Sequence, residues 1–451
     1  MSQRRNGPRH GLVLGIAEKE KAKGFPAPIW DEGPDGHLVT VAPTGAGKGV
    51  SCIIPALLTW QGPAIVIDPK GENYAVTAAR RRAMGQKVHV LDPFGITGCV
   101  QPASLNPFDI VGKPRTARWE DFVTLARAVV QDKTFGKNQD PYWDNRAASL
   151  IACAMAHASA HLPSPTLEDV LTLVLSYDQF AMDFRHQPFE NQCHPEIAAP
   201  FAPAGMAWDK TRIAITSTAV DLISYLMGGS VLTSLKRSTV DLRKVERGDP
   251  MTLYLVLPPD KLATHGKLLR LWMTCLMTVL TRRRTPPAEP TLLLVDEAAQ
   301  LGEMRELVTA VTLMRGYGIR VWTFWQDLSQ LKATYPDHWE AILNNCAYHQ
   351  YFGAATPMAA NALQAYLGDA LLRSVHRMKA NELALFRPRE RGAIVRMPSY
   401  LTDPMYQGLY EPNPFYEARQ PKLPWEEPGY ALEESADGVV LAFPQREGRD
   451  A

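Results

Sequence analysis

The strongest constraint on the fold is a series of short apolar runs that recurs along the chain. Most of these runs are apolar at consecutive positions, which is typical of parallel strands covered by helices on both faces. Several end in Asp or Pro, and helical patterns separate many of them. This alternation predicts an α/β fold with a doubly wound, mainly parallel sheet and right-handed crossovers. The runs are HLVTVAP (37–43), PAIVIDP (63–69), KVHVLDP (87–93), MTLYLVLP (251–258), TLLLVDEA (291–298) and RVWTFWQ (320–326).

The strand pattern is interrupted between residues 112 and 208, where three segments have helical periodicity with no strand between them. Thr166, followed by Glu168 and Asp169, predicts a helix start with a capping hydroxyl and an acidic first turn. We therefore expect an all-α domain inserted into the α/β core. The predicted division is an N-terminal segment (1–36), the core (37–111 and 209–410), the all-α domain (112–208) and a Pro-rich C-terminal tail (411–451).

Composition narrows the range of function classes. The chain has 451 residues, with 48 Lys and Arg against 47 Asp and Glu, so nucleic-acid binding would need a local basic surface. The six cysteines and 11 histidines show no metal-binding spacing, and we expect reduced thiols of a cytoplasmic protein. The longest apolar stretch, 268–280, contains an arginine and is too short to cross a bilayer. Residues 1–24 have neither a signal-peptide nor a transit-peptide composition.

The segment VAPTGAGKGVSCIIPALL (41–58) differs at two positions from a phosphate-binding loop. That pattern is Gly, four residues, Gly-Lys and then Ser or Thr, whereas here Ala42 and Gly49 replace the first and last of these residues. A strand precedes the loop and an apolar helix follows it, as the motif requires. We expect the backbone N–H groups to cradle the phosphates of ATP and Lys48 to reach the β- and γ-phosphates. The candidate nucleotide-binding residues are Thr44, Gly45, Ala46, Gly47, Lys48, Gly49 and Val50.

Gly49 stands where a hydroxyl normally binds Mg²⁺. Ser51 lies two residues further on, about 200° around a helix, and cannot simply substitute for that hydroxyl. The metal would then be held by phosphate oxygens, water and a carboxylate from elsewhere. On this stretch alone, a glycine-rich turn without a ligand is the alternative.

Two further strand ends carry candidate chemistry. Asp296 and Glu297 follow the apolar run 291–295, and we expect Asp296 to contact the Mg²⁺ shell and Glu297 to orient or deprotonate the attacking water. Gln326 follows the run 320–325. In RecA-like motors a glutamine at this place senses the γ-phosphate, and the alternative is a surface glutamine at a strand end.

Four other features allow both a functional and a structural interpretation. The turn after residue 67 contains Asp68, Lys70 and Glu72 at the predicted ligand-binding edge of the sheet. These side chains have a role near the nucleotide or the channel, or they only cap the following helix. We expect Arg80, Arg81 and Arg82 to form a solvated helix face, with phosphate contact as the alternative. Trp143 is expected in the core of the helical domain rather than on a base-stacking surface, and Lys332 is a candidate for facing a central pore.

As a set, these stretches resemble the coupling ATPases of type IV secretion and conjugation, the TraG class. Gly-Lys-Gly, where other families have Gly-Lys-Ser or Gly-Lys-Thr, is part of the likeness, so the altered loop does not indicate a dead site. The similar stretches lie in order between 39 and 354: PTGAGKGVSCIIPALLTW, IDPKGENYAVTA, VLDPFG, SLNPFDI, YWDNRAASLI, LLLVDEAAQLG, GYGIR, QDLSQLKATYP and ILNNCAYHQYFGA.

The resemblance implies a RecA-like P-loop ATPase that assembles as a homo-hexameric ring, with the all-α domain on its cytosolic side. In such rings a neighbouring subunit supplies an arginine to the γ-phosphate. Arg315, eleven residues before Gln326, is the candidate, and Arg320 is the runner-up.

Members of this class usually begin with a membrane anchor, but here the loop begins at Ala42. The alternatives are an anchor on a separate chain, an anchorless branch or a truncated chain. We expect a cytoplasmic protein, monomeric in isolation, that reaches the inner membrane only through partners.

The leading functional hypothesis is an ATP-driven motor that delivers DNA or a relaxase–DNA complex, bound without sequence preference, to a type IV secretion channel. A RecA-like DNA translocase in genome maintenance or defence is the second hypothesis. The third is a receptor for effector proteins in which the nucleotide is a structural ligand.

Overall fold

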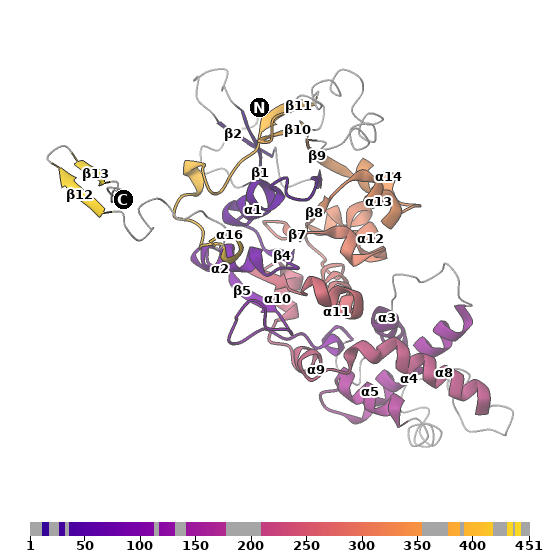
Figure 1. Ribbon diagram of the computed structural model, residues 1–451. Helices are drawn as coiled ribbons and strands as arrows, with labels where there is room; N and C mark the ends of the chain where they lie inside the picture. The colour runs from indigo at the N-terminus through magenta and orange to yellow at the C-terminus, as the bar shows by residue number, and fades with distance from the viewer. Residues whose placement is uncertain are drawn as a thin grey trace, which may run out of the picture.

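The computed structural model describes residues 11–17, 27–31, 36–111, 117–130, 141–176, 209–353, 378–387, 392–417, 431–435 and 438–442. An eleven-stranded sheet, in the order β2-β1-β11-β10-β9-β3-β8-β7-β4-β6-β5, forms its centre (Figure 1). Seven neighbouring strands are parallel, and six of them are the predicted apolar runs, so the α/β class is confirmed. The parallel strands are β9 (Cys346–Phe352), β3 (His37–Val41), β8 (Ile319–Trp325), β7 (Thr291–Val295), β4 (Ala64–Ile67), β6 (Met251–Leu255) and β5 (Lys87–Leu91).

The four remaining strands extend the sheet beyond β9 as an antiparallel group, which the apolar runs did not predict. Two of them come from the N-terminal segment, and the other two follow β9 in the chain. They are β2 (Ala27–Trp30), β1 (Val13–Ala17), β11 (Ala393–Arg396) and β10 (Glu382–Phe386).

Both faces of the parallel sheet are buried. On β8, Trp322 and Phe324 stack and face the cluster that includes α1 (Ile54–Thr59), whereas Val321 and Trp325 face the cluster of α11 (Pro259–Leu280) and α12 (Arg305–Leu313). This alternation is the period-two pattern of a strand with apolar side chains on both sides. Helix α2 (Glu72–Ala83) packs beside α1. The sheet is therefore the middle layer of a three-layer α/β/α arrangement.

The helical segments form a layer beside the sheet, with α11 between the two (Figure 1). Helix α4 (Pro141–His161) contacts α3 (Trp119–Val130), α5 (Leu167–Leu175) and α8 (Asp209–Ile223). The predicted start of α5 is confirmed: Asp169 N–H donates to the Thr166 hydroxyl, and Thr166 N–H donates to the Asp169 carboxylate. Because α8 packs on α4, we propose that the helical domain continues to Ile223. Trp143 is 36% exposed on α4, so the core interpretation of this residue was wrong.

The remaining helices are short. They are α9 (Gly229–Lys236), α10 (Leu242–Arg247), α13 (Leu328–Thr334), α14 (Trp339–Asn344) and α16 (Pro414–Glu417). Single turns occur at 107–110, 224–226, 298–301, 314–317 and 404–406. A π-helical turn spans Gly49–Ile53, and β12 (Ala431–Ser435) pairs with β13 (Gly438–Ala442).

In the described part of the chain, no helix alone has the length and apolar character to cross a membrane. The segments Ile213–Leu226 and Gly229–Lys236, which are bent by 85° relative to each other, reach that length and apolar character only when they are taken together.

The basic run at residues 80–82 contains a buried structural arginine, so its interpretation as a solvated face was wrong for Arg81. The Arg81 guanidinium is fully buried and donates to Thr252 Oγ1 at 2.8 Å and to Gly62 O at 2.7 Å, as well as to Trp60 O. Burial lowers the pKa of Arg81 to about 10, which still leaves it charged at neutral pH. Arg81 therefore joins α2 to β6 and to the turn between α1 and β4.

Replacing Arg81 by methionine should destabilise the fold by roughly 3 kcal/mol, because buried carbonyl groups would lose their donors. Urea unfolding of Arg81→Met would measure this change. Arg82→Met is the matched control, since the Arg82 side chain is exposed and should change stability by less than about 0.5 kcal/mol. Equal losses in the two variants would contradict the anchoring role of Arg81.

Candidate functional site

The candidate site lies at the carboxyl edge of the parallel sheet. In sheet order, the strands β3, β8, β7 and β4 are adjacent. They are followed in the chain by the loop with Lys48, by Gln326, by Asp296 and by Asp68, respectively. Because parallel strands place their carboxyl ends at one edge, side chains from distant parts of the chain meet there.

The loop after β3 has the backbone of a phosphate cradle. Gly45 and Gly47 have φ values of 78° and 88°, a left-handed region in which glycine is unstrained. A Cβ atom at Gly45 would meet no heavy atom within 4 Å, so the loop is open on that side. At its start, Ala42 N–H donates to Trp325 O on β8 at 2.8 Å. The φ of Ala42 is not positive and its methyl group is buried, so this position has no need of glycine.

Gly49 opens the π-helical turn that leads into α1, and Ile54 N–H donates to Gly49 O. A Cβ atom at Gly49 would also meet nothing within 4 Å. A serine would therefore fit at this position, and the missing hydroxyl is a chemical rather than a steric feature of the loop. Ser51 is buried, and its Oγ would lie 3.8 Å from a Cβ atom built at Gly47 of the loop.

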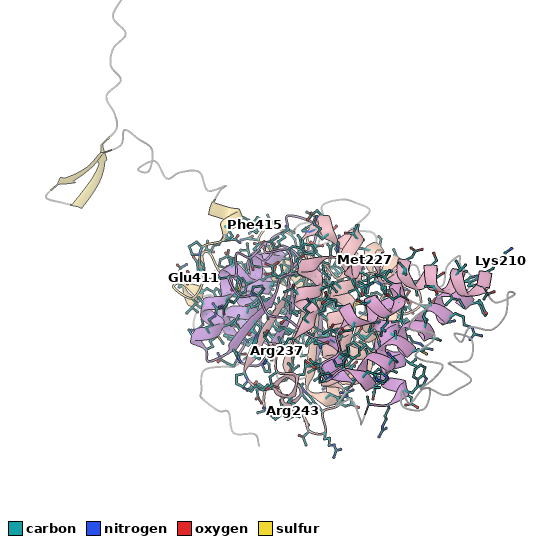
Figure 2. The ribbon with its side chains drawn as sticks, turned by 90° about the horizontal axis from the view of Figure 1, so that it is seen from below. Lys210, Met227, Arg237, Arg243, Glu411 and Phe415 are labelled. Atoms are coloured by element: carbon teal, nitrogen blue, oxygen red, sulfur yellow. The ribbon has the colours of Figure 1, made fainter. Side chains whose placement is uncertain are left out.

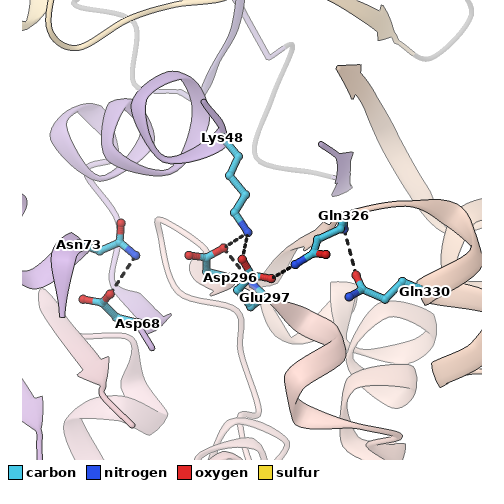
Figure 3. A network of polar contacts seen from close by, with 7 residues as sticks. All are labelled: Lys48, Asp68, Asn73, Asp296, Glu297, Gln326 and Gln330. Atoms are coloured by element: carbon cyan, nitrogen blue, oxygen red, sulfur yellow. Dashed lines mark hydrogen bonds and ion pairs between the residues drawn. The ribbon is translucent and has the colours of Figure 1, made fainter. Parts of the chain in front are cut away.

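Lys48 reaches across the end of β8 to the two carboxylates that follow β7 (Figure 3). Its Nζ lies 2.9 Å from Asp296 Oδ1 and 2.5 Å from Glu297 Oε1. Burial by itself lowers the pKa of Lys48, but the two carboxylates outweigh that effect and raise its pKa above the ordinary value. Burial also raises the pKa of Asp296, against the opposing charge of Lys48. The lysine therefore remains a cation at neutral pH.

Glu297 is held from both sides. Its Oε2 accepts a hydrogen bond from Gln326 Nε2 at 3.1 Å, and Gln326 N–H donates to Gln330 Oε1 at 3.0 Å (Figure 3). Among the described residues, Glu297 alone has a positive φ without being glycine. Its N–H donates to Asp296 Oδ1 at 2.9 Å, which closes the turn at the end of β7. The structure thus brings Lys48, Asp296, Glu297 and Gln326 into one network.

Asp68 is a buried neighbour of this network. Asn73 Nδ2 donates to its Oδ1 at 3.3 Å, and Tyr74 N–H donates to its Oδ2 at 2.8 Å. Burial raises the pKa of Asp68 to about 7, and the charge of Asp296 adds to the shift. Asn73 is a residue that sequence reasoning missed, although an amide five residues after a strand-end carboxylate is a usable signal. Lys70 is exposed, and Glu72 accepts a hydrogen bond from Asn413 instead.

Arg315 lies at the opposite edge of the sheet. It precedes β8 whereas Gln326 follows it, and a strand of seven residues separates the two by roughly 20 Å. Arg315 therefore does not belong to the Lys48 network of its own subunit. It is exposed between Leu313 and Tyr317, whose side chains are 70% and 36% exposed.

The runner-up arginine has a structural role. Arg320 is 1% exposed, forms an ion pair with Asp31 and donates to Gly36 O at 2.8 Å. A guanidinium that is buried and paired in this way is not available to a neighbouring subunit, so the runner-up prediction for Arg320 was wrong. Lys332 is exposed on α13, where its Nζ lies 4.4 Å from the centre of the Trp339 ring.

The acidic residues of the site fit a Mg²⁺ ion that is bound mainly by phosphates. In the part of the chain that the structure describes, no group of three or more His, Cys, Asp or Glu could hold a metal by itself. Magnesium commonly uses one or two carboxylates and takes its other ligands from phosphate and water. The side chains of Asp296 and Glu297, 17% and 23% exposed beside the loop, suit that limited contribution.

Comparisons with known proteins identify similar chains. The chain is 29% identical to a conjugal transfer protein TraG of Escherichia coli over 345 residues, which are 70% of the chain and 52% of that protein. It is 28% identical to protein VirD4 of Agrobacterium fabrum over 355 residues, 75% of the chain and 50% of that protein. The chain thus spans about half the length of the curated relatives it matches.

The fold matches solved structures. The plasmid coupling protein TrwB, in complex with ADP and Mg²⁺, superimposes with a TM-score of 0.62 at 16% identity, covering 80% of this chain and 84% of that one. VirB4 of Thermoanaerobacter pseudethanolicus superimposes with a TM-score of 0.54 at 14% identity, covering 89% and 99%. These likenesses establish the predicted RecA-like P-loop fold.

The family model described as type IV secretory system conjugative DNA transfer matches residues 8–384. This match spans most of the chain, including the phosphate loop and the turns with Asp296 and Gln326. The chain therefore belongs to the family of type IV secretory system conjugative DNA transfer proteins.

Proposed function

We propose that this protein is an ATP-driven motor that couples DNA, or a relaxase–DNA complex, to a type IV secretion channel. The observation that carries the proposal is the Lys48–Glu297–Gln326 network beside a phosphate cradle, in a chain of the conjugative DNA transfer family. The network joins a phosphate-binding cation, a carboxylate and an amide, which are the parts that a nucleotide hydrolase needs.

The proposed nucleotide site uses the loop from Thr44 to Val50. Backbone N–H groups would bind the phosphates, and Lys48 would contact the β- and γ-phosphates. Mg²⁺ would supply neutralising charge on the phosphate oxygens. Asp296 would accept hydrogen bonds from the water shell of the ion, because Gly49 offers no ligand.

We assign Glu297 the role of general base. In this structure Lys48 holds Glu297 Oε1 and Gln326 holds Glu297 Oε2. A carboxylate that is bound at both oxygens is a poor proton acceptor. If Lys48 turns to the phosphates, it frees Oε1 to orient or deprotonate water, while Gln326 keeps Glu297 connected to β8. The network thus makes the base available when the substrate is bound.

The proposed assembly is a homo-hexamer in which Arg315 acts on the nucleotide of a neighbouring subunit. Arg315 lies at the end of the sheet opposite the phosphate loop of its own subunit, so it cannot reach the nucleotide bound there. In the proposed ring it reaches the nucleotide of the neighbouring subunit instead. The exposed Leu313 and Tyr317 beside it supply apolar surface for such a contact. We propose that the isolated chain is monomeric and assembles on DNA or on partner proteins.

The proposed partners are DNA bound without sequence preference, relaxase or effector proteins, and channel components that recruit a cytoplasmic protein to the inner membrane. A DNA translocase for genome maintenance or defence, or a receptor for effectors with a structural nucleotide, would use the same fold. The family match favours conjugative transfer.

The motor proposal is tested by ATP turnover at increasing concentrations of DNA and of protein. A ring motor should respond to both, and stimulation by unrelated DNA sequences should fall steeply between about 50 and 200 mM salt. Lys48→Ala should abolish turnover and is the control for contaminating activity. Turnover that ignores DNA would favour the receptor, and salt-insensitive binding to one sequence would favour a site-specific adaptor.

Glu297→Gln should retain ATP binding and lower hydrolysis by about 10²- to 10⁴-fold, because the amide keeps the shape but cannot accept a proton. Single-turnover hydrolysis and binding of a fluorescent ATP analogue separate the two effects. Glu303→Gln is the matched control, since Glu303 is exposed just beyond the same strand end. Normal hydrolysis by Glu297→Gln would move the base to another residue, with Asp296 tested next.

Arg315→Ala should bind ATP normally but lose turnover, because its proposed role is exercised across a subunit interface. Mixing Arg315→Ala with Lys48→Ala subunits should restore part of the activity, since some interfaces then combine an intact loop with an intact arginine. Arg305→Ala, an exposed arginine at the start of α12, the helix that precedes the turn with Arg315, is the control. If mixed rings form and stay inactive, Arg315 does not act in trans.

A further inference from the structure

A segment near the C-terminal end of the described chain covers the helices next to the phosphate loop. We call residues 397–417 the strap. The fully buried rings of Tyr400 and Tyr406 pack against Ile54 and Leu58 of α1 and Val76 of α2. Figure 2 shows Glu411 and Phe415 of the strap on one flank of the molecule and Lys210 of the helical layer at the other end. The strap therefore contacts the nucleotide-binding core on the side away from the tip of that layer.

One hydrogen bond connects the strap to the phosphate loop. Tyr400 N–H donates to Val50 O at 3.2 Å, one residue after Gly49. In an α-helix Val50 O would accept from Ile54 N–H, but Ile54 N–H donates to Gly49 O in the π-helical turn. In the π-helical register Val50 O would accept from residue 55, which is proline and has no N–H. The strap thus supplies the donor that neither helical register provides.

Further contacts fix the strap on α2 and within itself. Glu411 N–H donates to Val76 O at 3.0 Å, and Asn413 Nδ2 donates to Glu72 Oε1 at 2.6 Å. Asp403 of the strap pairs with Arg396 at the end of β11 at 2.7 Å and accepts a hydrogen bond from Ser399 N–H. The position of Tyr400 N–H is therefore fixed by the ion pair of Asp403 near it and by the contacts of Glu411 and Asn413 with α2 further along the strap.

The geometry of the π-helical turn decides where the loop points. The apolar face of α1 is fixed by its packing in the core. One residue corresponds to about 100° of rotation around a helix, so rewinding the turn into α-helix would rotate Lys48 and Gly49 relative to α1 by that order. The contact of Lys48 with Asp296 and Glu297 depends on the present register.

We propose that Tyr400 is a positioning residue for the phosphate site, acting through its backbone N–H on the Val50 carbonyl. This bond holds the π-helical turn, so the loop amides and Lys48 stay directed toward the phosphates. The inference rests on the proposed nucleotide-binding role of the loop. It assigns to the strap a part in substrate binding, although no strap residue belongs to the loop or to the Lys48 network.

The first variants compare the loss of the backbone donor with the loss of strap packing alone. Tyr400→Pro removes the N–H together with the buried Tyr400 ring, and the affinity for a fluorescent ATP analogue with Mg²⁺ should fall about tenfold. Tyr406→Leu removes a buried strap ring and leaves Tyr400 N–H in place, so its melting temperature should fall while its affinity stays within about twofold of wild type. Equal losses of affinity in both variants would overturn the positioning role.

A rescue variant gives the decisive result. Pro55→Ala supplies an N–H that can donate to Val50 O, so Tyr400→Pro/Pro55→Ala should recover most of the lost affinity. Amide hydrogen exchange at residues 49–54 gives a readout that needs no nucleotide. It should speed up in Tyr400→Pro and slow again in the double variant.

The outcomes distinguish the two proposals. Unchanged affinity and exchange in Tyr400→Pro, or a folded double variant without recovery, would overturn the role of the strap and leave the proposed function intact. A wild-type chain that binds no nucleotide would overturn both.

Discussion

The parallel register of β3, β8, β7 and β4 is the constraint on which the site depends. Each strand ends at the same edge of the sheet, so the residues that follow them meet there although they are far apart in the chain. The register is stable because both faces of the sheet are buried, and a slip by one residue would turn each side chain to the opposite face. The chemistry of the site is therefore positioned by the packing of the whole core.

The charges at this edge depend on one another. Burying two carboxylates is unfavourable unless a cation and hydrogen bonds compensate, and Lys48 with Gln326 provides that compensation for Asp296 and Glu297. A phosphate that attracts Lys48 changes the state of the carboxylate it leaves. We infer that substrate binding and activation of the base are coupled through one ammonium group. The strap adds a second coupling, because it holds the turn from which Lys48 extends.

Sequence patterns did not predict which arginine and tryptophan side chains are buried. Arg81, Arg315 and Arg320 all occur beside apolar stretches, yet two are buried anchors and one is exposed. Arg81 and Arg320 are buried because carbonyl groups or a carboxylate from distant segments surround their guanidinium groups, as Asp31 does for Arg320. Trp143 differs from the expected core residue for the same reason, because burial depends on which helices pack over a position.

The local sequence was sufficient for the six apolar parallel strands, the cap of α5 and the motif residues at the strand ends, since these follow from side-chain periodicity and short-range hydrogen bonding. The expectation that the loop binds nucleotide despite Ala42 and Gly49 came from the resemblance to the TraG class and not from the local pattern. The tertiary structure alone decided the antiparallel extension of the sheet, the contact of Glu297 with both Lys48 and Gln326, the burial of Arg320 and the strap on α1 and α2. These features join residues that are far apart in the chain. Their free energy depends on packing and desolvation, which no short stretch of sequence encodes.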